Sequence, residues 1–195
     1  MGPVGWALGN ALLSLGQWVR ARTAFATARD SRTVGLYVEA LRSQAALRAD
    51  TADLHSGLAE LDAAIASGQR LAAEAGVGED EFDGEVLEPH VLRQGAHLLA
   101  RHGEVDAAVE RLARAEALVG HDFELVLRAE AGIMLADHDR LDAAEPRLRA
   151  SIAELHAAGV VPTRVDAAGA LAGALDRAGR GDEAEEVWSR YGAEG

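Results

Sequence analysis

The chain repeats a short pattern of turn and small residues along its length, and this repetition limits its possible folds more than any other feature. One instance is Gly103 followed by Ala108, Leu112 and Ala115, at offsets of five, four and three residues. The same offsets recur in four other places: Gly16–Ala21–Phe25–Ala28, Ala49–Leu54–Leu58–Leu61 (the weakest match), Asp139–Ala144–Leu148–Ser151 and Gly179–Ala184–Trp188–Tyr191. Repetition of this kind indicates stacked supersecondary units.

The spacing predicts that each unit is a helical hairpin. A Gly or Asp at the first position tolerates the left-handed backbone angles that turn a chain after a helix. The small or apolar residue five positions later allows close packing, and the next two positions lie on the same helical face. Asp106, Asp142 and Asp182 follow the turns by three residues and are expected N-caps. Glu145 and Glu185 would complete capping boxes for the last two.

The first unit also carries an aromatic-x-Leu-Gly opening, at Trp6 to Gly9. With Gly16, Ala21, Phe25 and Ala28, this opening resembles the tetratricopeptide repeat (TPR) family, and the resemblance extends over residues 4 to 192. It implies an all-α fold, a right-handed solenoid of antiparallel helix pairs with about five hairpins. We expect one domain, 1–195, with hairpins at about 4–30, 34–75, 89–119, 123–157 and 163–192, and an acidic insertion at 76–88.

Composition excludes several classes of protein. The net charge is −13, and all 19 basic residues are Arg, as in proteins from GC-rich bacterial genomes. An acidic chain repels nucleic acid and anionic membrane, so neither is an expected partner. The absence of Cys excludes disulfides and thiolate chemistry. Residues 3–16 lack the features of a signal peptide, and no long apolar run predicts a membrane helix. We expect a cytoplasmic protein, with an exported form as the alternative.

Catalytic and metal-binding motifs are missing from the sequence. No Gly-x-Ser-x-Gly, phosphate-loop or dinucleotide fingerprint occurs, and the seven His residues include no His-Glu-x-x-His pair. The acidic segment 79–84 is only distantly similar to a calcium loop, because His90 occupies the twelfth position, where a carboxylate is required. We therefore expect no cofactor, no metal and no enzymatic activity.

The TPR resemblance implies that the first helix of each hairpin lines an inner groove. Registering the repeats places a group of polar residues among small, apolar ones there: Asn10, Ser14, Glu39, Ser43, His90, Arg93, Gln94, His97, Arg101 and Glu130. Such a groove would orient an extended or helical peptide by hydrogen bonds, with Arg93 or Arg101 holding a carboxylate. The alternative is that these side chains form an ordinary solvated face.

These features favour a protein- or peptide-binding repeat module that acts as an adaptor or scaffold. The alternative is a TPR-type sensor or oligomerisation segment of a larger bacterial transcriptional regulator. Trp188 and Tyr191 stand near the C-terminal end, where solenoids normally carry a polar cap. They make self-association through that end a further expectation.

Overall fold

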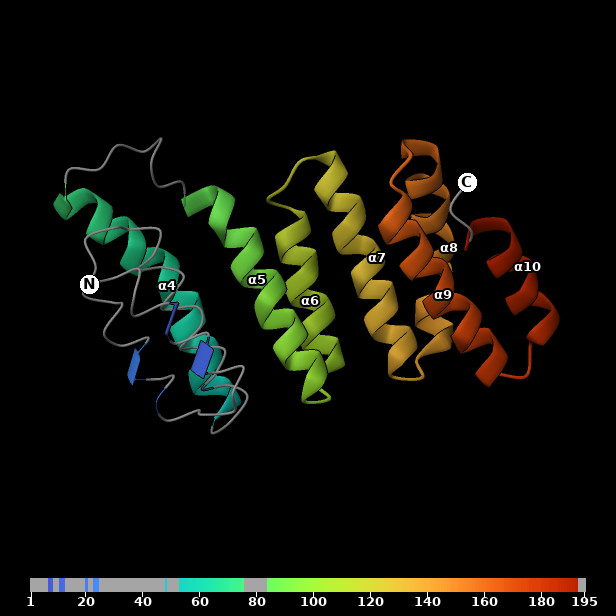
Figure 1. Ribbon diagram of the computed structural model, residues 1–195, viewed down its shortest axis with the longest axis horizontal. Helices are drawn as coiled ribbons and strands as arrows, with labels where there is room; N and C mark the ends of the chain where they lie inside the picture. The colour runs from blue at the N-terminus through green and yellow to red at the C-terminus, as the bar shows by residue number, and fades with distance from the viewer. Residues whose placement is uncertain are drawn as a thin grey trace. The chain divides into compact units, whose positions relative to one another are not determined.

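The structure is a computed structural model, in which residues 53–75 and 84–192 are described, together with residues 7, 8, 11, 12, 20, 23, 24 and 48 (Figure 1). Contacts divide the chain into two compact units, residues 1–98 and 99–195. Every regular element in the described ranges is an α-helix, and the helices follow one another in sequential pairs. The predicted all-α, TPR-like class is confirmed.

The first unit contains helix α4, Leu54–Ala75, and most of helix α5, Gly84–Arg101. Asp53 caps α4, because its Oδ1 accepts the backbone N–H of Ser56 at 3.2 Å. The Ser56 hydroxyl donates to the same carboxylate, and these bonds lower the pKa of Asp53. Because α5 begins at Gly84, residues 84–88 of the expected insertion are helical.

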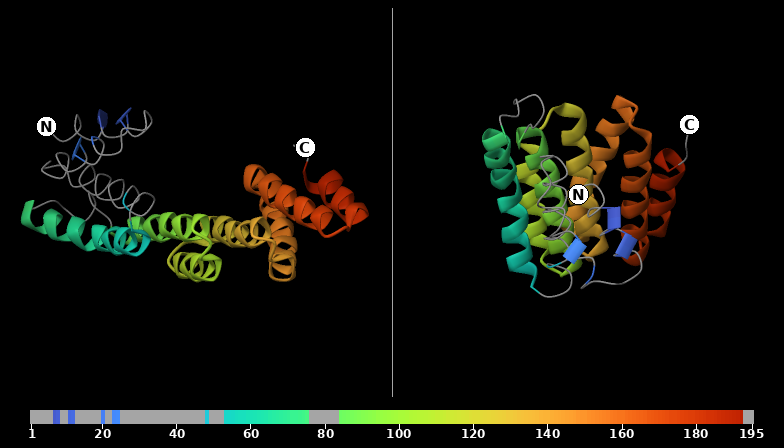
Figure 2. Two further views of the ribbon diagram at one scale, coloured as in Figure 1. Left: turned by 90° about the horizontal axis from the view of Figure 1, so that it is seen from below. Right: turned by 60° about the vertical axis from the view of Figure 1, so that its left-hand side comes forward.

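The second unit contains five helices: α6 Val105–Glu116, α7 His121–Asp137, α8 Leu141–Ala158, α9 Val161–Arg177 and α10 Gly181–Tyr191. Helix α7 packs against α6, α8 and α9, and α9 packs against α8 and α10. Helices α6 and α8 lie on the same side of α7 (Figure 2, left). The largest side chains buried at these contacts are Leu112, Leu125, Leu127, Leu148, Ile152, Leu155, Leu171 and Leu175.

The turns of this unit occur where the repeat predicts them. Gly103, Asp139 and Gly179 have φ angles of 82°, 57° and 77°, and each stands between the two helices of a hairpin. These angles are in the left-handed region that Gly adopts freely and Asp tolerates. Gly159, at φ 72°, caps α8 in the same way, although the repeat pattern does not mark it.

The predicted N-caps are wrong. The capping positions are Glu104, Arg140 and Arg180, and none of them makes a side-chain capping bond. Only one residue separates each left-handed turn residue from the next helix, so the helix starts earlier than the capping-box pattern suggests. The three aspartates lie within the first turns instead, where their charge complements the helix dipole.

The turn residues set a register between the hairpins, with offsets of 36 and 40 residues from Gly103 to Asp139 to Gly179. In this register the small residues at Ala108, Ala144 and Ala184 are all buried. Three residues on different second helices also share one position: Leu112, Leu148 and Trp188. The leucines are 1% and 0% exposed, whereas Trp188 is 48% exposed.

Candidate functional site

Five of the predicted groove residues lie on helix α5. His90, Gln94, His97 and Arg101 are spaced along one stripe of the helix, and Arg93 lies beside it. His90, His97 and Arg101 are exposed, whereas Arg93 and Gln94 are half-buried. Glu130 is half-buried on α7. The remaining four, Asn10, Ser14, Glu39 and Ser43, lie outside the described residues. The groove assignment as a whole stays a prediction.

Helix α7 presents a matching stripe. Val126, Glu130, Ile133 and Asp137 stand 36 residues after His90, Gln94, His97 and Arg101. The first three are half-buried and Asp137 is exposed, whereas the neighbouring residues 125, 127, 129, 131 and 132 are buried against other helices. Two apolar side chains and two carboxylates therefore alternate along this stripe of α7, where Ile133 also packs partly against the core.

Helix α9 continues the stripe within the second unit. Forty residues after the α7 positions come Asp166, Ala170, Gly173 and Arg177. Ala170 and Gly173 are half-buried, and the two charged residues are exposed. Since α7 and α9 pack together, these positions form one strip in which small or apolar residues alternate with charged ones, three of them acidic and one basic. We call it the α7–α9 strip.

The prediction from the sequence selected polar side chains, so it included only Glu130 among the residues of the α7–α9 strip. The signal that would have found them is the repeat register. With successive offsets of 36 and 40 residues, Val126 and Asp166 occupy the repeat position of His90. Ile133 and Gly173 occupy that of His97 in the same way.

Side chains at the ends of the first helices connect successive hairpins. The Nε2 atom of His138 lies 2.9 Å from the carbonyl oxygen of Ala100, in the last turn of α5. One repeat later, Nη2 of Arg177 donates to the carbonyl oxygen of Ala136 at 2.7 Å, and its Nε donates to Asp139 at 3.1 Å. Each of these carbonyl oxygens also accepts a backbone N–H of the turn that follows, from Gly103 and from Asp139, so the side chains add a bond between hairpins at the helix ends.

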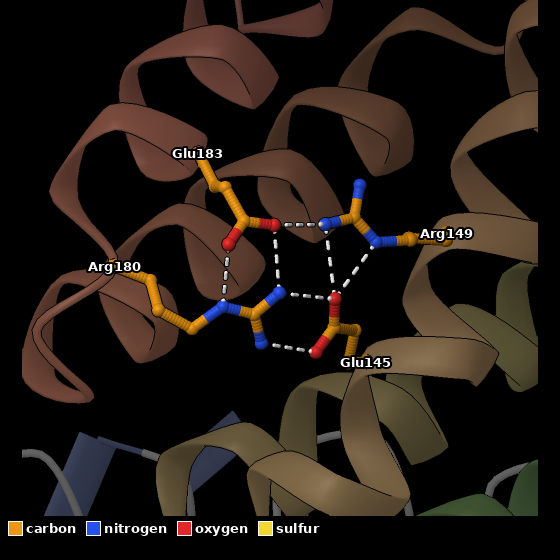
Figure 3. A network of polar contacts seen from close by, with 4 residues as sticks. All are labelled: Glu145, Arg149, Arg180 and Glu183. Carbon is orange, nitrogen blue, oxygen red and sulfur yellow. Dashed lines mark hydrogen bonds and ion pairs between the residues drawn. The ribbon is translucent and has the colours of Figure 1, made fainter.

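The second helices are connected by a cluster of two arginines and two glutamates (Figure 3). Arg180 donates to both oxygens of Glu145, at 2.6 and 3.0 Å, and to both oxygens of Glu183, at 2.7 Å each. Arg149 donates to Glu145 and Glu183 at 3.0 and 3.3 Å. The hydrogen bonds from Arg180 are the main reason that the pKa values of Glu145 and Glu183 are lowered.

A second cluster surrounds Arg128 on the opposite side of α7 from the strip. Its Nε donates to Glu116 of α6 at 2.7 Å, its Nη1 donates to Glu154 of α8 at 3.0 Å, and it also pairs with Glu124. The hydrogen bond to Glu116 is the largest cause of the raised pKa of Arg128. Both clusters pair charges across helix contacts, so they serve to hold the helices together.

Near the end of α10, Tyr191 packs edge-on against His156 of α8, with 5.6 Å between ring centroids. The guanidinium carbon of Arg190 lies 5.1 Å from the centre of the Tyr191 ring. Both residues border a small crevice between α8 and α10 whose floor includes Ile152 and Val187. Tyr191 is therefore half-buried within its own unit.

Among the described residues, no group of three or more His, Asp or Glu side chains is placed to hold a metal ion. The same residues contain no helix that is both long enough and apolar enough to cross a membrane.

Comparisons with known proteins agree with this architecture. No family model and no curated protein matches the sequence. Solved structures do match: the nearly identical TPR-like repeats of a Podosopora anserina kinesin light chain align with 96% of this chain and 91% of theirs, at a TM-score of 0.63 and 16% identity. The Q17M form of that protein gives the same values. The MamA protein aligns with 97% of this chain and 89% of its own, at a TM-score of 0.55 and 15% identity.

The chain therefore has the fold of TPR-like repeat proteins over nearly its whole length. At 15% and 16% identity the likeness shows the fold alone. Any partner has to be argued from the surfaces of this chain.

Proposed function

We propose that this chain is a non-enzymatic adaptor or scaffold of the bacterial cytoplasm that binds a protein or peptide segment along its first helices. One observation carries the proposal: the α7–α9 strip leaves the apolar side chains Val126 and Ile133 partly exposed between carboxylates. In a surface helix whose other faces are packed, such an arrangement offers apolar contact and charge together, which suits a peptide ligand.

The strip also suggests the chemistry of the segment that it binds. Glu130, Asp137 and Asp166 would favour a segment carrying Lys or Arg, whose apolar neighbours would pack on Val126 and Ile133. On α5, Arg93 or Arg101 would hold a carboxylate of the partner, as the sequence analysis proposes. Glu145 and Glu183 accept bonds from Arg180, and they lie outside the α7–α9 strip.

The first test identifies a partner and then measures its affinity. Affinity capture followed by mass spectrometry would supply the segment, and fluorescence anisotropy of a labelled peptide would give its Kd. Asp166→Arg should weaken binding by about tenfold or more, because it replaces attraction by repulsion at the strip. Glu185→Arg, which makes the same charge change at an exposed site on α10, is the matched control. Equal affinities for both variants would place the binding surface elsewhere.

The α5 residues are tested in the same assay. Arg93→Ala combined with His97→Ala should abolish capture of the partner while helicity by circular dichroism persists. Retained capture by this double variant would remove α5 from the proposed surface. The α7–α9 strip would then be tested by the affinity of the Asp166→Arg variant alone.

A second candidate function is a sensor or oligomerisation segment of a larger bacterial transcriptional regulator. The observation that favours it is the 48% exposure of Trp188, at a position that is buried in two other hairpins. An uncovered aromatic side chain of this size is typical of an association surface.

A further inference from the structure

The crevice between α8 and α10 has an apolar floor. Ile152 of α8, Leu171 of α9 and Val187 of α10 form it, and these side chains are 2%, 0% and 5% exposed. They meet because α8 and α10 both pack on α9. The volume of the crevice is about 120 Å³. An apolar group of matching size can therefore lie on the floor of this crevice, which we call the α8–α10 crevice.

Two arginines line the α8–α10 crevice from different helices. Arg149 of α8 uses Nε and Nη2 for Glu145 and Glu183, whereas its Nη1 donates to no residue in the described part of the chain (Figure 3). Arg190 of α10 is exposed, and its guanidinium carbon lies 5.1 Å from the centre of the Tyr191 ring. Within the described residues it pairs with no carboxylate. Both arginines therefore keep N–H donors for an acid group in the crevice.

Glu186 adds a carboxylate to the same crevice. It stands four residues before Arg190 on α10, at the spacing where glutamate and arginine commonly pair along a helix. Both side chains are exposed and belong to the described residues, yet no ion pair or hydrogen bond joins them. The crevice therefore presents separate positive and negative groups beside its apolar floor.

We propose that the α8–α10 crevice binds a free apolar α-amino acid with a side chain about the size of that of leucine. The carboxylate of the ligand accepts hydrogen bonds from Arg149 and Arg190, which are charge-assisted and therefore strong. The ammonium group of the ligand lies against Glu186, and the side chain covers Ile152 and Val187. This site lies on second helices of the hairpins, so it is separate from the peptide surface proposed along the first helices.

The charges of the crevice select a zwitterion over a simple acid or amine. A ligand with a carboxylate alone leaves Glu186 beside a like charge, and a ligand with an ammonium alone leaves Arg149 and Arg190 beside one. Each mismatch lowers affinity. The volume selects the side chain, because an apolar cavity of about 150 Å³ holds a benzene molecule. The smaller crevice fits a branched four-carbon group and is too small for an indole.

Nuclear magnetic resonance titration of the ¹⁵N-labelled full chain tests the ligand class. L-leucine should bind with a Kd of about 0.1–1 mM, and it should shift the amides of residues such as Arg149, Ile152 and Val187. N-acetyl-L-leucine lacks the ammonium group and L-leucinamide lacks the carboxylate, so each should bind about tenfold more weakly. Glycine and L-tryptophan should also bind more weakly, because one has no side chain and the other has an oversized one.

Two pairs of variants assign the charged groups. Arg190→Gln should weaken L-leucine binding by about tenfold, whereas Arg147→Gln, at an exposed site of α8 outside the crevice, should not. Glu186→Gln should remove the preference for L-leucine over N-acetyl-L-leucine, and Glu185→Gln on the same helix should keep it. This preference compares two ligands on one protein, so a change in stability of the variant does not affect it.

Three outcomes would overturn the proposal. The first is that about 10 mM L-leucine leaves the amides of α8 and α10 unshifted, since the expected Kd is well below that concentration. The second is that N-acetyl-L-leucine binds as tightly as L-leucine, which would indicate a site for the last residue of a peptide. The third is that Arg190→Gln binds as well as the wild type. The titration needs no peptide partner, so this proposal and the proposed function can fail independently.

Discussion

Gly179 is the residue at which the last hairpin depends most directly on backbone conformation. Its φ of 77° lies in the left-handed region, and no atom lies within 4 Å of a Cβ built there. A side chain at this position would meet no steric obstacle from neighbouring residues. The cost of a substitution is therefore the cost of holding an L-residue in a left-handed conformation.

Gly179→Ala should lower the free energy of unfolding by about 1 kcal/mol for that reason. Gly181→Ala is the control, because Gly181 is the first residue of α10 and its added Cβ would make only an ordinary 3.8 Å contact with Asp176. Alanine there should leave stability unchanged or raise it slightly. Urea unfolding followed by circular dichroism measures both. Equal destabilisation by the two alanines would contradict the backbone explanation.

At the scale of helices, the contact between α8 and α10 depends on Glu145. Arg180 donates to both of its oxygens, and the side chain is 21% exposed. This pairing lowers the pKa of Glu145. A carboxyl group whose pKa is lower in the folded state stabilises the fold above its unfolded pKa. It loses that contribution as the pH falls through its folded pKa.

Glu145→Gln should therefore reduce stability by about 1 kcal/mol at neutral pH. The difference from the wild type should shrink as the pH falls from about 4 through the lowered pKa of the folded Glu145, below which both proteins carry a neutral side chain at this site. Thermal unfolding at several pH values measures it, with Glu185→Gln on the exposed side of α10 as the control. A difference that persists unchanged at low pH would show that the effect is not due to the carboxylate charge.

The same helices show which parts of the fold could be predicted from the sequence. Turn positions were predicted correctly because Gly and Asp are selected by a local requirement, a positive φ, at Gly103, Asp139 and Gly179. The N-caps were not, because Asp142 and Asp182 are equally suitable inside a first turn. Their role depends on where the preceding turn ends, and Arg140 and Arg180 turned out to occupy the capping positions.

At the scale of the whole molecule, the candidate site could be predicted only in part from the sequence. Polar residues such as His97 and Glu130 stand out in a sequence, whereas Val126 and Ile133 are indistinguishable from core residues until their exposure is known. The clusters around Arg180 and Arg128 include pairs that are 12, 26 and 35 positions apart. Such pairs depend on how neighbouring hairpins pack, which local sequence patterns do not encode.

A repeat array is stabilised mainly by contacts between neighbouring units, so its helices need not open together. Within the second unit, α8 packs against both α7 and α9, whereas the main packing partner of α10 is α9. The amides of α10 should therefore open at a free energy about 1–3 kcal/mol below those of α8. Hydrogen exchange read by mass spectrometry measures this difference.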